Sequence, residues 1–312
     1  MTPENSFSRA FVDLAKMGRT DWRSIALTIL LVKFLSVLFV VISVTVVLSP
    51  TLSEHRLFHI PNADKIVFDA MEATACILGF WLACKKILRR PFRSLISTDM
   101  TFKIRRCLMG AALYLPANAL SLIVISLFTS MRAGAWLVPY GRFEWPQHND
   151  QIISSIGMLI VIPFLAFAEE LFFRAWLTQT LRHYIRSTIT VVALVAVLFA
   201  AYHTQYDLRG KMLILVNSLG LSALSLRDER LELAIGAHSM MNVCVILQTL
   251  FFTGPLPHVH IPATTLDWYT LVILKGALPF ALMYGLLQNT RGWFAPIDTS
   301  LSNPGDVQPR PV

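Results

Sequence analysis

Charge is what this sequence has least of. Only 15% of its 312 residues are Asp, Glu, Lys or Arg, whereas 55% are hydrophobic, and the mean hydropathy is +0.58. Soluble globular chains carry about a quarter charged residues. The low charge and the long apolar runs therefore exclude an ordinary soluble domain and predict a polytopic membrane protein.

Cysteine is also scarce, and internal repeats are absent. The four cysteines have no paired spacing of the kind that zinc sites use, and they fall in or beside the apolar runs, as reduced packing residues do. Many transporters are built from repeated halves, so the lack of a repeat argues against that class.

Eight apolar runs predict eight membrane helices, because backbone polar groups in lipid must bond within their own segment. The fifth and sixth runs are short for a ~20-residue crossing, so we expect them to pack inside the bundle. The predicted fold is an all-α polytopic bundle with a polar intramembrane chamber. The runs are 24–48, 66–84, 107–129, 152–172, 188–203, 212–226, 232–253 and 268–288.

Basic residues predict the orientation. If segment 85–106, which holds eight Lys and Arg, is cytoplasmic, eighteen basic residues lie inside and six outside, with both termini in the cytoplasm. Contact with anionic lipid accounts for the net charge of +8 better than nucleic-acid binding does. Ahead of the first span, Phe7, Phe11 and Leu14 share one helical face, which predicts a short interfacial helix.

Two adjacent acids, Glu169 and Glu170, lie inside an apolar run and are followed by Arg174. Ionisable residues at membrane depth are costly and are functional candidates by default. Glu170 and Arg174 are four residues apart on a helix and can pair, whereas Glu169 faces elsewhere. The pattern leaves one acid free for chemistry, although a purely structural ion pair would look the same.

Two further polar sets occur downstream. His203 ends an apolar run, and His238 and Asn242 share one face of another. Each set alone is typical of packing between helices. However, Glu169 lies 17 residues before Arg186 and His203 lies 17 after it, so a helical hairpin would bring them to similar height. That match requires the hairpin to project beyond the bilayer; a fifth span crossing straight would carry His203 to the outer face.

A carboxylate and two imidazoles around one cavity suit the activation of water. An amide and an imidazole can also donate to a developing oxyanion. The combination favours hydrolysis of a peptide bond, either directly or with a metal such as Zn²⁺. The candidate metal ligands are Glu169, His203 and His238.

The ordered patterns Glu-Glu-x-x-x-Arg, Phe-x-x-x-His and His-x-x-x-Asn resemble those of the CPBP family of intramembrane proteases. This family includes the Ras-converting CAAX prenyl endopeptidases and bacterial Abi proteins. Here the patterns run from Glu169 to Arg174, from Phe199 to His203 and from His238 to Asn242. The resemblance covers about residues 150–255. Ala175 stands where many family members have Gly.

The resemblance implies a role for each residue. Glu169 would activate water with His203 as its partner, and Glu170 and Arg174 would brace the helix. His238 and Asn242 would form an oxyanion hole or complete a metal site; the family mechanism has been argued both ways, and both readings stay open here.

The chain then divides into three parts. Residues 1–150 hold the interfacial segment and three helices, residues 151–255 the protease core, and residues 256–312 the last helix and a disordered tail. The expected substrate is a membrane-anchored protein or peptide, and the expected location is a bacterial cytoplasmic membrane. The alternative is a non-catalytic membrane protein of the same fold, such as a scaffold, a bacteriocin-immunity protein or a transporter.

Other polar residues favour a structural role. Asp69, Glu72 and Lys275 lie within spans and indicate pairing between helices, with a substrate or proton path as the alternative. His258 and His260 form a short pair in an outer loop that has no nearby acid, which does not favour a metal site.

Overall fold

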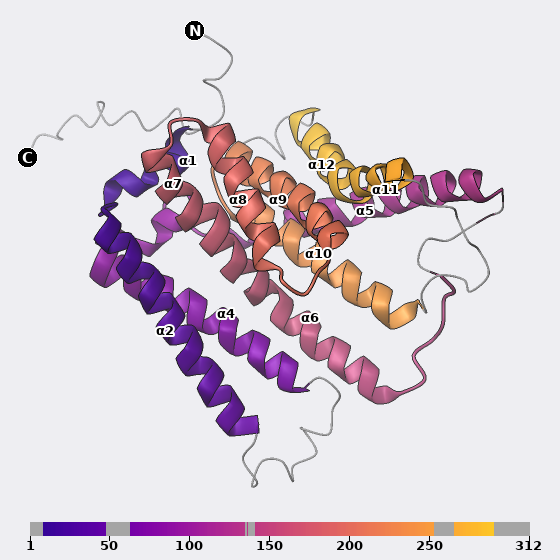
Figure 1. The fold of residues 1–312 in the computed structure, drawn as a ribbon, viewed down its shortest axis with the longest axis horizontal. Helices are drawn as coiled ribbons and strands as arrows, with labels where there is room; N and C mark the ends of the chain where they lie inside the picture. Colours follow the sequence, from indigo (N-terminus) through magenta and orange to yellow (C-terminus); the bar gives the residue numbers. More distant parts are fainter. Residues whose placement is uncertain (1–8, 48–62, 135, 137–140, 253–264, 290–312) are drawn as a thin grey trace, which may run out of the picture.

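The computed structural model describes residues 9–47, 63–134, 136, 141–252 and 265–289, and these residues form an all-α bundle without a β-strand (Figure 1). The predicted fold class is confirmed. The helices are α1 (Arg9–Asp13), η2 (Leu14–Met17), α2 (Trp22–Val47), α4 (Ala63–Ala83), η4 (Cys84–Leu88), η5 (Phe92–Leu95), α5 (Ile104–Ala133), α6 (Asn149–Glu170), η6 (Leu171–Leu177), α7 (Thr178–Tyr184), α8 (Thr188–Tyr202), α9 (Leu208–Asp228), α10 (Glu232–Phe251), α11 (Thr265–Val272), η7 (Ile273–Ala277) and α12 (Leu278–Asn289).

All eight predicted spans overlap helices, but a count of eight crossings is not confirmed. α8 is apolar, yet its 15 residues extend only about 22 Å, less than the ~30 Å hydrocarbon core. α9 carries buried polar residues, among them Asn217 and Ser218. Six helices in the described part of the chain are long and apolar enough to cross: Trp22–Thr45, Asp64–Leu88, Ile104–Ala133, Asn149–Tyr184, Glu232–Phe251 and Asp267–Gln288.

One helical stretch of 36 residues, Asn149–Tyr184, joins α6, η6 and α7. The chain then turns within three residues, and α8 runs back beside η6, as Figure 1 shows. Phe173 of η6 packs there against Val191, Val195 and Phe199 of α8. η6 and α7 have seven residues each and α8 has 15, so at similar rise per residue the last turn of α8 returns to about the level of Glu169. This geometry places His203 near Glu169.

Helices α5 and α10 approach each other closely through two glycines. A Cβ added to Gly236 would lie 1.8 Å from the carbonyl oxygen of Cys107, and one added to Gly110 would lie 2.1 Å from that of Leu233. No side chain fits at such distances, so hydrogen at both positions allows backbone contact between the helices, as small residues do in membrane bundles. The contact fixes α10, which carries His238 and Asn242.

The basic segment 85–106 is folded onto the start of α10 by a group of residues that we call the polar clasp: Asp99, Lys103, Arg230 and Glu232. The Glu232 carboxylate is fully buried and accepts hydrogen bonds from the Lys103 backbone N–H at 2.9 Å and from Arg230 Nη2 at 2.6 Å. Arg230 Nη1 lies 2.5 Å from Asp99 Oδ2. Burial opposes ionisation of Asp99, but hydrogen bonds from Lys103, Thr101, Arg230 and Ser97 outweigh it and lower the pKa of this carboxyl.

The N-terminal segment differs from the predicted interfacial helix. Phe11 of α1 is fully buried and packs in one cluster with Leu88, Leu95 and Trp176. Its apolar face therefore contacts the protein rather than the surface of a bilayer. Phe7, which the prediction placed on the same face as Phe11 and Leu14, lies outside the described residues.

Candidate active site

The two adjacent acids lie at a change of helix type. α6 ends at Glu170, and a π-helical segment, η6, follows at once. Such segments occur frequently at functional sites in proteins. The Glu170 side chain is fully buried, whereas 22% of the Glu169 side chain is exposed. The predicted division between one enclosed acid and one accessible acid is therefore present.

Arg174 is held from three sides. Its Nη1 lies 3.2 Å from Glu170 Oε1, an ion pair without hydrogen-bond alignment, and its Nη2 donates to Ser218 Oγ at 2.9 Å. The guanidinium carbon lies 4.1 Å from the centre of the Phe199 ring, a cation–π contact. The predicted pair with Glu170 is confirmed, and α8 and α9 are tied to η6 through the same side chain.

His238 lies between the two carboxylates. Its Nδ1 is 2.8 Å from Glu170 Oε1, and its Nε2 is 3.4 Å from Glu169 Oε2. A carboxylate only accepts hydrogen bonds when ionised, so Nδ1 carries the proton in the Glu170 contact. The imidazole is 3% exposed and is thus fixed with Nε2 directed at the accessible acid.

His203 follows the last residue of α8 and is oriented by its own helix. Its Nδ1 lies 2.8 Å from the carbonyl oxygen of Phe199. A carbonyl cannot donate, so Nδ1 carries the proton and Nε2 is an acceptor. The Phe199 ring stands 4.6 Å from the His203 ring and 6.1 Å from the His238 ring. Phe199 thus contacts the key residues of all three sequence patterns.

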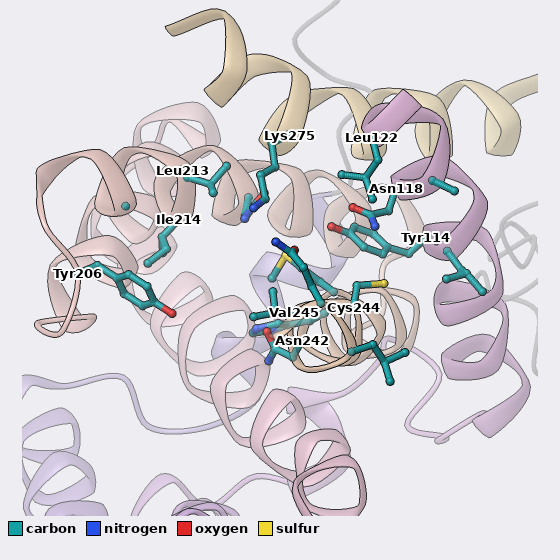
Figure 2. A pocket seen from close by; sticks show the side chains of 18 of the residues that line it. Tyr114, Asn118, Leu122, Tyr206, Leu213, Ile214, Asn242, Cys244, Val245 and Lys275 are labelled. Atoms are coloured by element: carbon teal, nitrogen blue, oxygen red, sulfur yellow. The ribbon is translucent and has the colours of Figure 1, made fainter. Parts of the chain in front are cut away.

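A cavity of about 550 Å³ brings the candidates together. Glu169, His203, His238 and Asn242 all line it, and Figure 2 shows Asn242 on the α10 side. Its volume is in the range of small-molecule and peptide sites. Most of the remaining lining is apolar, with Leu115 and Leu122 from α5, Leu213 and Ile214 from α9, and Met241, Val245 and Phe251 from α10.

Several polar residues that the sequence analysis did not assign to the site also line the cavity. Lys275, for which the sequence predicts pairing between helices, also lines the cavity, as do Asn118, Asn217 and Tyr206. A polar side chain within an apolar run was the available signal for Asn118 and Asn217. Glu72 does pair between helices, accepting a hydrogen bond from Tyr202 at 3.0 Å, whereas Asp69 pairs with Lys65 on its own helix.

The side chains do not form a zinc site in this geometry. No group of three or more His, Cys, Asp or Glu side chains in the described part of the chain is placed to hold a metal ion. Catalytic zinc sites use three protein ligands and one open position, but both His238 nitrogens face carboxylates. Classification as a metalloprotease is therefore not supported by the described side chains. His258 and His260 lie outside the described residues.

Comparisons with known proteins point to one family. Residues 151–244 match the family model described as type II CAAX prenyl endopeptidase Rce1-like. The chain is 29% identical over 129 residues to the uncharacterized protein YyaK of Bacillus subtilis (strain 168), an alignment that covers 41% of this chain and 40% of that protein. No solved structure matches significantly.

The matched segment contains every candidate residue of the site, from Glu169 to Asn242, and the family is one of peptidases. The resemblance stated from the sequence is confirmed by this match: residues 151–244 of this multi-pass membrane protein match the Rce1-like CAAX prenyl endopeptidases, which is consistent with the CPBP family of intramembrane proteases.

Proposed function

We propose that this protein is an intramembrane endopeptidase that hydrolyses a peptide bond in a membrane-anchored protein or peptide, using water activated by Glu169. One observation carries the proposal: Glu169, His203, His238 and Asn242, from distant parts of the chain, line a single cavity. The Rce1-like match over residues 151–244 supports the same reaction class.

Glu169 is the general base. Its carboxylate is partly exposed, and it is the only carboxylate that lines the cavity in the described part of the chain. It takes a proton from water as the water oxygen attacks the scissile carbonyl carbon. His203, whose Nε2 is an acceptor, orients that water.

His238 transfers the proton onward. Nε2 faces Glu169, while Glu170 holds Nδ1 and thereby fixes the ring. When the carbon–nitrogen bond of the tetrahedral intermediate breaks, the proton taken from water passes through Nε2 to the leaving amine. The products are a new carboxyl terminus and a new amino terminus. This role suits the geometry better than oxyanion binding, because Nε2 already faces an acid.

Asn242 stabilises the oxyanion. It lies one helical turn beyond His238 and lines the cavity, so its amide N–H₂ can donate to the carbonyl oxygen as negative charge develops. Arg174 and Phe199 hold the surrounding helices in place; Arg174 does not line the cavity, whereas Phe199 forms part of its wall.

The surroundings suit an apolar substrate within the bilayer. We place the protein in a bacterial cytoplasmic membrane with both termini in the cytoplasm, where its basic segments meet anionic lipid. The partners are the lipid bilayer and the membrane-anchored substrate. Nucleic acid is not a partner.

Purified protein incubated with bacterial membrane fractions tests the proposal. Mass spectrometry should detect new peptide termini with the wild-type protein, and Glu169→Gln should lower their rate of formation about 10²–10⁴-fold, the usual contribution of a general base. Glu72→Gln is the matched control, since Glu72 lies in a neighbouring helix and bonds Tyr202 instead of lining the cavity.

Equal turnover by wild type and Glu169→Gln would overturn the assignment of the base. No new termini from any folded protein would favour the non-catalytic alternative.

A further inference from the structure

A lysine reaches into the cavity from the side opposite α10. Lys275 lies in η7, the π-helical segment between α11 and α12, and Figure 2 shows its side chain extending toward the region where Asn242 lies. Among the described lining residues, Glu169 is the one carboxylic acid and Lys275 is the one lysine or arginine. The proposed reaction uses Glu169 but gives Lys275 no role.

Two amides from the helices that contact η7 line the same cavity. Asn118 projects into the cavity from α5, as Figure 2 shows, and Asn217 lines it from α9. Asn217 is only 9% exposed, and its Oδ1 is buried without a hydrogen-bond partner among the described residues. The oxygen and nitrogen of an amide side chain are told apart only by their hydrogen-bond partners, so the position without a partner can be either an acceptor or a donor. In both cases it can form a hydrogen bond with a ligand.

The backbone around Lys275 is packed closely against α9 and α5. Gly276, next to Lys275, packs on α9: a Cβ there would lie 2.9 Å from Val216 and 3.0 Å from Leu213. On the opposite flank, Ser121 of α5 donates to the carbonyl oxygen of Leu274. The lysine backbone is thereby fixed between the two helices that supply Asn118 and Asn217.

The geometry points to a carboxylate-binding subsite made by Lys275, Asn118 and Asn217. A cation flanked by amides suits an anion, and the charge of Glu169 makes the choice directional, because a substrate carboxylate is attracted to Lys275 and repelled from Glu169. This inference rests on the proposed peptidase function. It assigns residues of this chain to substrate selection: Lys275, Asn118 and Asn217 favour a carboxylate on the Lys275 side of the scissile bond.

Such a carboxylate can be the free C-terminus of a peptide or the side chain of Asp or Glu. Three lipid-anchored fluorescent hexapeptides of Ala, Val and Leu distinguish these sources. The first ends in a free carboxylate, the second ends in an amide, and the third ends in an amide but carries one Glu. Binding is measured by fluorescence anisotropy in the Glu169→Gln background, where hydrolysis does not interfere.

We expect the free-carboxylate peptide to bind about ten- to a hundredfold more tightly than the amide peptide, the effect of a hydrogen bond to a charged group. Lys275→Met should bring this ratio close to one, whereas Lys275→Arg should keep most of it. Lys33→Met is the matched control and should leave the ratio unchanged, since Lys33 is an exposed lysine of α2 that does not line the cavity. A gain for the Glu peptide alone would assign the subsite to side-chain carboxylates.

Equal binding of all three peptides to the lysine-containing protein would overturn the subsite, as would a preference that survives Lys275→Met in folded protein. A different result would contradict the proposed function: wild-type protein, with Glu169 intact, would cleave none of the peptides and no natural membrane protein. A carboxylate preference that depends on Lys275 would then stand as a binding property without hydrolysis.

Discussion

The active site and the polar clasp are both clusters of charge in an apolar protein, but they use charge differently. In the clasp, every buried side-chain nitrogen and oxygen of Arg230 and Glu232 has a hydrogen-bond partner. In the active site, Glu170 Oε2 and Arg174 Nε are buried without one, and the neighbouring Glu169 and His238 line a cavity of about 550 Å³.

The comparison shows how a structural cluster differs from a functional one. Buried polar groups stabilise a fold only when they are fully paired. The clasp meets this condition and joins segment 85–106 to the start of α10. The site instead leaves space for a substrate and a water molecule in the cavity that Glu169, His203 and His238 line, while Glu170 and Arg174 stay enclosed behind it. Substitutions can therefore separate residues that stabilise the fold from residues that take part in the reaction.

Arg174→Ala should have the largest effect, because Arg174 is the structural part of the site. Removing it leaves the fully buried Glu170 without its cation, and breaking a buried pair costs about 3–5 kcal/mol. We expect a lower thermal unfolding midpoint in detergent and lower yield, together with lost activity. Normal stability with abolished turnover would instead place Arg174 in the chemistry.

Asn242→Ala should reduce kcat by about 10²–10³-fold while KM changes little, as the loss of one oxyanion donor does in other hydrolases. Asn242 lines the cavity and is only partly buried, so the folded state should keep its stability. Steady-state kinetics and a thermal melt on the same preparation separate the two effects. A lower melting temperature with unchanged kcat of the folded fraction would reveal a packing residue.

Gly236→Ala should have an intermediate effect that reaches the site through the fold. Its Cβ would lie 1.8 Å from the Cys107 carbonyl oxygen, so α10 must move away from α5, and overpacking of this kind typically costs about 1–3 kcal/mol. Activity should fall as well, because His238 follows two residues later. Gly285→Ala is the control, since a Cβ there meets nothing within 4 Å. Equal behaviour of the two variants would contradict the close-contact argument.

The sequence allowed some of these features to be predicted, for physical reasons. Glu170 and Arg174 are four residues apart on one helix, and local geometry is enough to pair them. His238 contacts Glu170 across 68 residues, and its ring orientation depends on how closely α5 and α10 pack. Periodicity does not supply that information. The level of His203 likewise depended on where the α7–α8 turn lies, which hydropathy alone left open.

The N-terminal segment shows a second limit. An apolar helical face indicates burial but does not say against what, and Phe11 packs on protein where a lipid surface was expected. Lys275 shows a third: a lysine in an apolar run can pair with another helix, face a cavity or do both, and only the packing of η7 between α5 and α9 reveals that it lines the cavity.

Chelation should have the smallest effect of all. Both His238 nitrogens face carboxylates, and the described residues offer no three-ligand cluster, so turnover by purified protein should be unchanged after treatment with EDTA or 1,10-phenanthroline. Elemental analysis of the same sample measures whether metal was bound before treatment. Loss of activity on chelation, with recovery when Zn²⁺ is added back, would overturn the metal-free mechanism. It would require His238 to release Glu169, so that Glu169, His203 and His238 could together bind the ion.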